Sequence, residues 1–270
     1  MKIVFALFLM LNFEQSHAQE LFVYTEPASN MATKSIGLRL NNYFMNERFS
    51  SKYNYHFVPE IMWGVSKRLM IHAEGFFSNR TNSLKAEGGG LYIKYRFYSQ
   101  DEVHSHSRMA AYLRGAVNNS DIHQPAIDLN GQNSGYEAGL VATKLMNKLA
   151  LSVNGSFVHA ADNSSGNKFP YADKKREAVA YAFSAGQLIL PKEYKNYEQT
   201  NLNAMIEVLG QTNLNSGRSY IDLAPSVQFI FLSKMRLDIG YRFPVLNDLE
   251  RTAPEGFLLR FEYNFFNAYK

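Results

Sequence analysis

The sequence predicts an all-β fold, a membrane-spanning antiparallel up-and-down β-barrel of about 12 strands. Apolar and polar side chains alternate along the chain, and no apolar run beyond the N-terminus approaches the roughly 20 residues of a spanning helix. Short turns also alternate with long loops. The segment 257–266, FLLRFEYNFF, shows the alternation clearly. Its bulky register is Phe257, Leu259, Phe261, Tyr263 and Phe265, and its other register carries Arg260, Glu262 and Asn264.

Length and composition agree with a single barrel. The chain has 270 residues, and β-barrels of this size commonly form one domain. A hydrophobic fraction of 46% argues against a disordered chain, and a mean hydropathy of −0.28 argues against a bundle of membrane helices. The 14% aromatic content favours strands and suits a membrane interface. There is no cysteine, and the net charge of +4 is too small and too dispersed to predict nucleic-acid binding.

The N-terminus predicts export. MKIVFALFLMLNFEQSHAQE has Lys2, an apolar core from Ile3 to Phe13, and small residues at Ser16 and Ala18 in the spacing that signal peptidase recognises. We expect residues 1–18 to be a signal peptide and residues 19–270 to form the outer-membrane β-barrel. An uncleaved membrane anchor is the alternative, but the apolar run is too short to span and no stop-transfer pattern follows it.

Twelve candidate strands follow in order. In the first, Ile36 and Leu38 alternate with Arg39; in the second, Ile61 and Trp63 alternate with Glu60. The fourth opposes Ile93 and Tyr95 to Lys94 and Arg96, the fifth opposes Leu113 to Arg114, and the second half repeats the pattern. Most segments approach the ~9–11 residues that a tilted strand needs to cross a bilayer. Their ranges are 34–45, 55–64, 68–79, 89–99, 108–119, 134–145, 149–160, 176–190, 200–210, 219–232, 235–246 and 257–266.

The connections between the candidate strands alternate in length. Those after the second, sixth and tenth are tight, whereas those after the fourth and eighth are intermediate. The tight turns are 66–68, 146–148 and 233–234, and the long polar loops include 119–133, 161–175 and 246–256. Short turns on one side, long loops on the other and an even strand count are typical of an outer-membrane barrel with both termini in the periplasm. A β-sandwich has no reason to alternate in this way.

The export signal, the alternating strands and the aromatic-rich last strand resemble a Gram-negative outer-membrane β-barrel. That resemblance implies contact with outer-membrane lipid and recognition of the last strand by the barrel-assembly machinery. The chain departs from the usual aromatic final residue, because NAYK follows Phe266. More narrowly, VPEIMWGVSKRLMIHAEGFFS at 58–78 resembles the signature of putative transporters of the MetA-pathway phenol-degradation family, although a strand proline and a tight basic turn also have generic structural explanations.

If lipid contacts the apolar register, the opposite register lines the lumen. These charges predict either a pore or anion site with a slight positive excess, or a barrel filled by pairing across strands. Both interpretations stay open, because charges inside a barrel need partners or water in either case. The predicted lumen-lining residues are Arg39, Glu60, Glu74, Lys94, Arg96, Arg108, Arg114, Glu207, Asp222, Arg236, Asp238, Arg242, Arg260 and Glu262.

Catalytic residues are not predicted. A barrel lipase needs a serine beside an oriented histidine, and the nearest group is His159 with Asn163 and Ser164. Ser164 lies five residues on, which does not match the His-x-Ser-Asn run of outer-membrane phospholipases. Asp121 with His123, and Asp162 with His159, resemble barrel proteases in composition only.

Metal ligands and cofactors are also not expected. Asp101, Glu102, His104 and His106 lie close in sequence, but a solvated periplasmic turn explains them without a metal. His56 with Glu60, and His72 with Glu74, are further ligand types inside the predicted barrel. No phosphate-binding loop or dinucleotide fingerprint occurs.

The resulting hypothesis is a passive channel or transporter-like barrel for small solutes, not an enzyme. The first alternative is a closed structural or adhesive barrel whose outer loops bind a partner. A lipid-modifying barrel enzyme is the second alternative.

Overall fold

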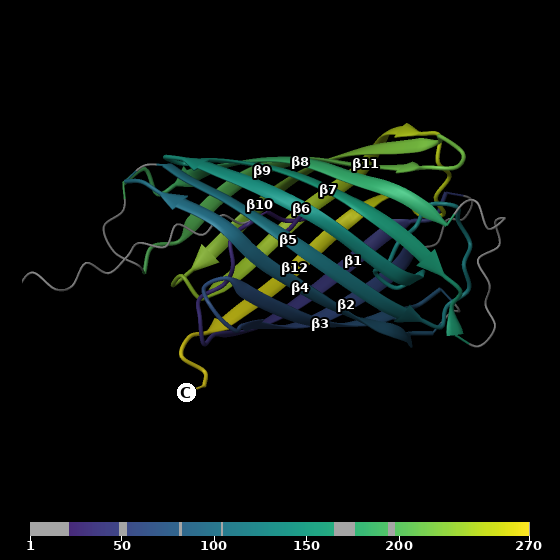
Figure 1. The fold of residues 1–270 in the computed structure, drawn as a ribbon, viewed down its shortest axis with the longest axis horizontal. Helices are drawn as coiled ribbons and strands as arrows, with labels where there is room; N and C mark the ends of the chain where they lie inside the picture. The colour runs from purple at the N-terminus through teal and green to yellow at the C-terminus, as the bar shows by residue number, and fades with distance from the viewer. Residues whose placement is uncertain are drawn as a thin grey trace, which may run out of the picture.

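The computed structural model describes residues 22–48, 53–80, 83–103, 105–164, 176–193 and 198–269. The predicted signal peptide lies outside these residues. The chain forms a closed barrel of 12 antiparallel strands, as the sequence predicts (Figure 1). Within the described ranges, no helix is long and apolar enough to cross a membrane. The strands are β1 Ile36–Asn46, β2 Tyr53–Gly64, β3 Leu69–Ser78, β4 Lys85–Asp101, β5 Ser105–Asn118, β6 Ser134–Met146, β7 Leu149–Ala161, β8 Glu177–Leu190, β9 Asn201–Asn213, β10 Ser219–Phe231, β11 Met235–Asn247 and β12 Glu255–Phe265.

Every strand pairs with its neighbours in sequence, and the first and last strands close the sheet. β1 and β12 pair along the whole length of β1, from Ile36 opposite Phe265 to Asn46 opposite Glu255. Closure leaves no unpaired sheet edge, which a bilayer would not tolerate. The strands run obliquely across the barrel (Figure 1), as closure of a sheet requires.

The two registers of each strand face different surroundings. In β12, Phe257 is 55% exposed and Phe261 is 43% exposed, whereas Leu258 is fully buried and Arg260 is 6% exposed. An exposed register of aromatic and aliphatic side chains over a buried register with charges is the inverse of a water-soluble barrel. The apolar register therefore faces lipid, which confirms the membrane-spanning fold.

A β-bulge makes the fourth strand longer than the sequence predicts. The β4–β5 register shifts between Arg96 and Tyr98, so Phe97 and Tyr98 are both exposed. Beyond the bulge the pairing continues to Asp101 opposite His106, and most of the expected loop after 99 is strand. A strict two-residue alternation cannot account for the extra residue that a bulge inserts into a strand.

Tight hairpins occur at one end of the barrel. Met146 pairs with Leu149, leaving Asn147 and Lys148 as a two-residue turn, and Asn147 has a positive φ of 53°. Positive φ is what such turns require for the strand twist to continue, and asparagine tolerates it. Both ends of the barrel wall, the start of β1 and the end of β12, lie on this side (Figure 1).

Two segments outside the strands fill the interior. Residues 22–35, called here the internal segment, precede β1, and residues 119–133, called here the inner loop, connect β5 to β6. Apolar residues of both are buried against the inner wall: Phe22, Val23 and Ala28 from the first, and Ile122, Ile127 and Leu129 from the second. The barrel interior is therefore the core of the molecule.

Candidate functional site: the occupied lumen

Glu207 of β9 anchors the beginning of the internal segment. Its buried carboxylate accepts hydrogen bonds from the backbone N–H groups of Val23 and Tyr24 at 2.8 Å each and of Thr25 at 3.0 Å. The Thr25 hydroxyl donates to the same carboxylate at 2.7 Å. A carboxylate with this many donors forms a charge-assisted clamp on three consecutive residues.

Lys94 of β4 holds the middle of the internal segment. Its ammonium group donates to the carbonyl oxygens of Pro27 at 2.6 Å and Ser29 at 2.8 Å. Between them, the Ala28 N–H donates to the hydroxyl of Thr143 on β6 at 2.9 Å. Side chains from separate wall strands thus satisfy backbone groups that have no strand partner, as buried backbone requires.

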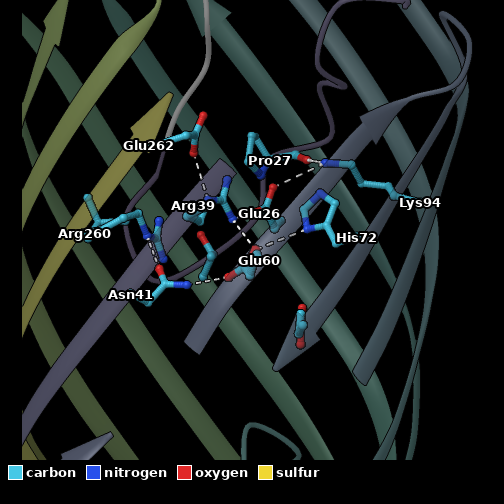
Figure 2. A network of polar contacts seen from close by, with 12 residues as sticks. Glu26, Pro27, Arg39, Asn41, Glu60, His72, Lys94, Arg260 and Glu262 are labelled. Carbon is cyan, nitrogen blue, oxygen red and sulfur yellow. Dashed lines mark hydrogen bonds and ion pairs between the residues drawn. The ribbon is translucent and has the colours of Figure 1, made fainter. Parts of the chain in front are cut away.

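Glu26 of the internal segment joins a charged network on the inner wall (Figure 2). Arg39 of β1 contacts Glu26, and it also contacts Glu60 at 3.2 Å and Glu262 at 2.8 Å. In Figure 2, Glu26 lies between Arg39 and Lys94, whose ammonium is 3.7 Å from the Glu26 carboxylate. Burial alone would raise the pKa of the Glu26 carboxyl, but the charges of Arg39 and Lys94 outweigh it and hold that pKa well below its usual range. Glu26 is therefore an anion at neutral pH.

The network continues around the wall onto the last strands. Arg260 of β12 donates to the side-chain oxygen of Asn41, and its guanidinium lies 3.6 Å from Asp238 of β11. Arg236 lies 3.0 Å from Asp238 and 3.1 Å from Glu262. On β1, β12 and β11, opposite charges therefore lie across from one another: Arg39 from Glu262, Glu262 from Arg236, and Arg260 from Asp238.

The inner loop and a second loop fill the opposite end of the lumen. The Gln211 side chain of β9 holds the loop backbone at Ile127, accepting from its N–H at 2.8 Å and donating to its carbonyl at 2.9 Å. Arg251, in the loop between β11 and β12, is buried and pairs in bidentate fashion with Asp222. Its guanidinium lies 3.8 Å from the ring centroid of Tyr220.

The structure buries most of the side chains that the sequence assigns to the lumen. Arg96 differs in position, because it lies beside the β4 bulge and donates to the carbonyl of Lys67 in the β2–β3 turn at 2.7 Å. The half-buried members of the set are Arg96, Arg108, Arg114 and Arg242. The buried members are Arg39, Glu60, Glu74, Lys94, Glu207, Asp222, Arg236, Asp238, Arg260 and Glu262. Their contribution to solute passage stays a prediction.

Three residues that hold segments inside the lumen were not predicted from the sequence. Glu26 lies in a segment without alternation, and Arg251 lies in a loop, so neither carries a strand signal. Gln211 alternates correctly, but an uncharged amide gives no reason to expect a loop contact 84 residues away in sequence.

Two side chains of the lipase-like grouping have structural contacts among the described residues. The Asn163 amide donates to the carbonyl oxygens of Ser120 and Gln132, and its oxygen accepts from the Ser134 N–H, so this side chain fixes loop backbone. His159 stacks on Tyr136 with ring centroids 5.1 Å apart. Ser164 is exposed.

The sequence-adjacent metal candidates also have structural contacts. In the β4–β5 turn, Nδ1 of His106 lies 2.8 Å from Asp101, and Arg108 donates to the same carboxylate at 2.9 Å. His104 lies outside the described residues. Inside the barrel, Glu60, His72 and Glu74 come together, whereas His56 stacks on Tyr43 at a centroid distance of 5.9 Å.

Comparison with known proteins agrees with the fold. The chain matches no protein-family model and no curated protein sequence. Its structure is similar to that of the COG4313 outer membrane channel from Pseudomonas putida F1, with a TM-score of 0.55, 12% identity, and coverage of 90% of this chain and 99% of that one. It is also similar to the NanC porin, with a TM-score of 0.51, 10% identity, and coverage of 86% and 98%. The barrel fold that the chain shares with these proteins confirms the outer-membrane location expected from the sequence.

Proposed function

We propose that the protein is a passive outer-membrane channel for small solutes and that the internal segment closes it. The observation that carries this proposal is the kind of contact that holds residues 22–35 in the lumen. Glu207, Lys94 and Arg39 bind the segment through hydrogen bonds and ion pairs. Water can replace these polar contacts when the segment leaves, whereas the apolar contacts of Phe22, Val23 and Ala28 with the wall oppose its departure.

The wall that would be uncovered supports conduction. Charged side chains of β1, β4, β9 and β12 face the internal segment, and water would hydrate them in an open lumen. Because Arg39 and Lys94 would each lose the Glu26 partner, departure of the segment would leave excess positive charge on this part of the wall. We therefore propose small anionic or polar solutes as the preferred class, carried without catalysis.

We propose, more narrowly, a barrel of the MetA-pathway transporter type. Residues 58–78 resemble the MetA-pathway putative transporters, and these residues form much of β2, a tight turn and β3. The resemblance supports a transporter-like barrel and leaves the solute unassigned.

Deletion of residues 22–33 from the refolded mature chain tests the proposal in planar bilayers. We expect the full-length barrel to stay closed for most of a recording and the deletion variant to give a steady conductance. A matched control replaces residues 22–33 by a Gly/Ser segment of equal length, which keeps a chain in place without Glu26 and Phe22. This control should give intermittent openings.

The alternative with specific support is a closed structural or adhesive barrel. The inner loop and Arg251 fill the end of the lumen away from the start of β1 and the end of β12, so the barrel is occupied from both ends. If the deletion variant folds, as judged by faster gel mobility without boiling, and still does not conduct, this alternative replaces the channel. Equal conductance of full-length and deletion proteins would exclude closure by the internal segment.

A further inference from the structure

Three potential metal ligands meet on the inner wall where β2 and β3 pair. Glu60 of β2 is directly opposite Glu74 of β3, and His72 is two residues from Glu74 on the same face of the strand. One ligand atom from each of the three residues lies within 4.8 Å of the other two. All three side chains are buried (Figure 2 labels Glu60 and His72).

Two of these groups carry polar atoms without a hydrogen-bond partner among the described residues. They are Nε2 of His72, whose residue is 1% exposed, and Oε2 of Glu74, whose residue is 7% exposed. Buried polar atoms are normally satisfied, because an unsatisfied one costs about 1–3 kcal/mol. Nδ1 of His72 lies 3.5 Å from Oε2 of Glu60, so Nε2 of His72 and Oε2 of Glu74 are the polar atoms of the group that lack a partner in the described part of the chain.

The neighbouring strand has a glycine opposite Glu74. Gly90 of β4 pairs with Glu74, and a Cβ atom at position 90 would lie 3.2 Å from Oε2 of Glu74. Glycine therefore lets the buried Glu74 carboxylate lie against β4 with no side chain between them. Any larger side chain at this position would crowd the carboxylate.

We infer that Glu60, His72 and Glu74 form a binding site for a divalent transition-metal ion such as Zn²⁺. One imidazole with two carboxylates is a borderline ligand set, which suits Zn²⁺, Mn²⁺ or Fe²⁺ better than Ca²⁺ or Mg²⁺. Ligand bonds of about 2.0–2.2 Å keep any two ligand atoms within roughly 4.4 Å, so small side-chain rotations would complete the site. An open coordination position would remain for water or a solute.

Two positively charged side chains lie beside the site and limit how strongly it binds a metal ion. Arg39 lies 3.2 Å from Glu60, and Arg114 lies 3.4 Å from Glu74. The connected network holds equal numbers of acidic and basic groups among the described residues, so an ion is not needed for charge balance. We therefore expect binding to be reversible and the metal-free barrel to keep its fold.

Titration of the untagged, refolded mature chain with Co²⁺ alone tests the site by visible absorption, followed by competition with Zn²⁺. We expect one Co²⁺ per barrel, displaced by Zn²⁺. His72→Gln and Glu74→Gln should each weaken Co²⁺ binding by at least about 100-fold, because loss of a ligand exceeds the 10–100-fold effect of losing a supporting contact. Gel mobility without boiling reports folding.

Matched controls identify the ligands. His56→Gln changes a buried histidine on β2 that lies outside the group, and His106→Gln changes the histidine of the β4–β5 turn; both should bind Co²⁺ as the wild type does. No uptake by the wild type, full uptake by His72→Gln, or equal loss in His56→Gln would each overturn the site.

X-ray absorption of the Zn²⁺-loaded wild-type barrel keeps the test decisive if the ligand variants fail to fold. One imidazole with oxygen ligands supports the site. No imidazole, or more than one, overturns it. None of these measurements depends on conduction, so failure of the channel proposal and failure of the metal site are distinguishable.

Discussion

The inward position of Glu207 could be predicted from the sequence, whereas its hydrogen-bond partners could not. Alternation along β9 predicts that its side chain points inward, and the structure buries it. Its four hydrogen bonds to Val23, Tyr24 and Thr25 could not be predicted, because these partners lie 182 or more residues away in sequence. A carboxylate in a strand pattern indicates its side of the wall, but a backbone N–H partner has no sequence signature.

Glu207→Gln should loosen the start of the internal segment. The amide has only one acceptor oxygen and no charge, so at least one of the donors at Val23, Tyr24 and Thr25 loses its partner, at a cost of about 1–3 kcal/mol. Hydrogen exchange of the peptide covering 22–28 should become faster. The control is Glu137→Gln, which alters another carboxylate of the inner wall that accepts from Tyr112. Equal exchange in the two variants would contradict the clamp.

Elements were more predictable than contacts. All twelve strands overlap their predicted ranges, because period-two alternation persists wherever one face contacts lipid and the other is enclosed. The extension of β4 to Asp101 was missed, since the bulge near Arg96 breaks the alternation while pairing continues. The internal segment was missed for a related reason: it has no periodic pattern and is held by side chains of the wall.

The last strand gives the sharpest test of the two registers. Phe261 is exposed and lies between Leu40 of β1 and Leu237 of β11, whereas Asn264 is buried and donates to Glu262. Phe261→Arg should destabilise the barrel by roughly 2–4 kcal/mol if it lies near the bilayer midplane. Asn264→Arg places the same charge beside an acid and should cost less. Refolding yields into lipid vesicles compare the two, and equal losses would mean that the registers are reversed.

At the scale of the whole molecule, the sequence predicts the closed barrel wall but leaves open whether the lumen is filled. Strand number and loop alternation define the wall, and neither depends on what lies within it. Arg251 and Asp222 show the difference: alternation places Asp222 inward, but only the folded loop brings the Arg251 guanidinium onto it. The choice between an open and an occupied lumen therefore needed the three-dimensional arrangement.

Arg114 and Arg242 set the expected ion preference of the opened barrel. They lie on different strands, 3.4 Å from Glu74 and in contact with Asp222 respectively. In a chain lacking residues 22–33, replacing both by Gln should shift the reversal potential away from anions, most strongly at low salt where screening is weakest. The thermal unfolding temperature should also fall, because Glu74 and Asp222 lose partners. An unchanged reversal potential in a folded, conducting double variant would show that these arginines do not face the conduction path.

The continuity of the internal segment with β1 has a kinetic consequence. The segment runs directly into Ile36, so after leaving the lumen it stays tethered at the mouth where β1 begins and β12 ends. A short tether keeps the internal segment at an effective concentration in the millimolar range relative to its binding site in the lumen. Re-entry is then a first-order event that does not depend on protein concentration. Any agent that keeps the barrel open must bind the released internal segment strongly enough to compete with this high effective concentration.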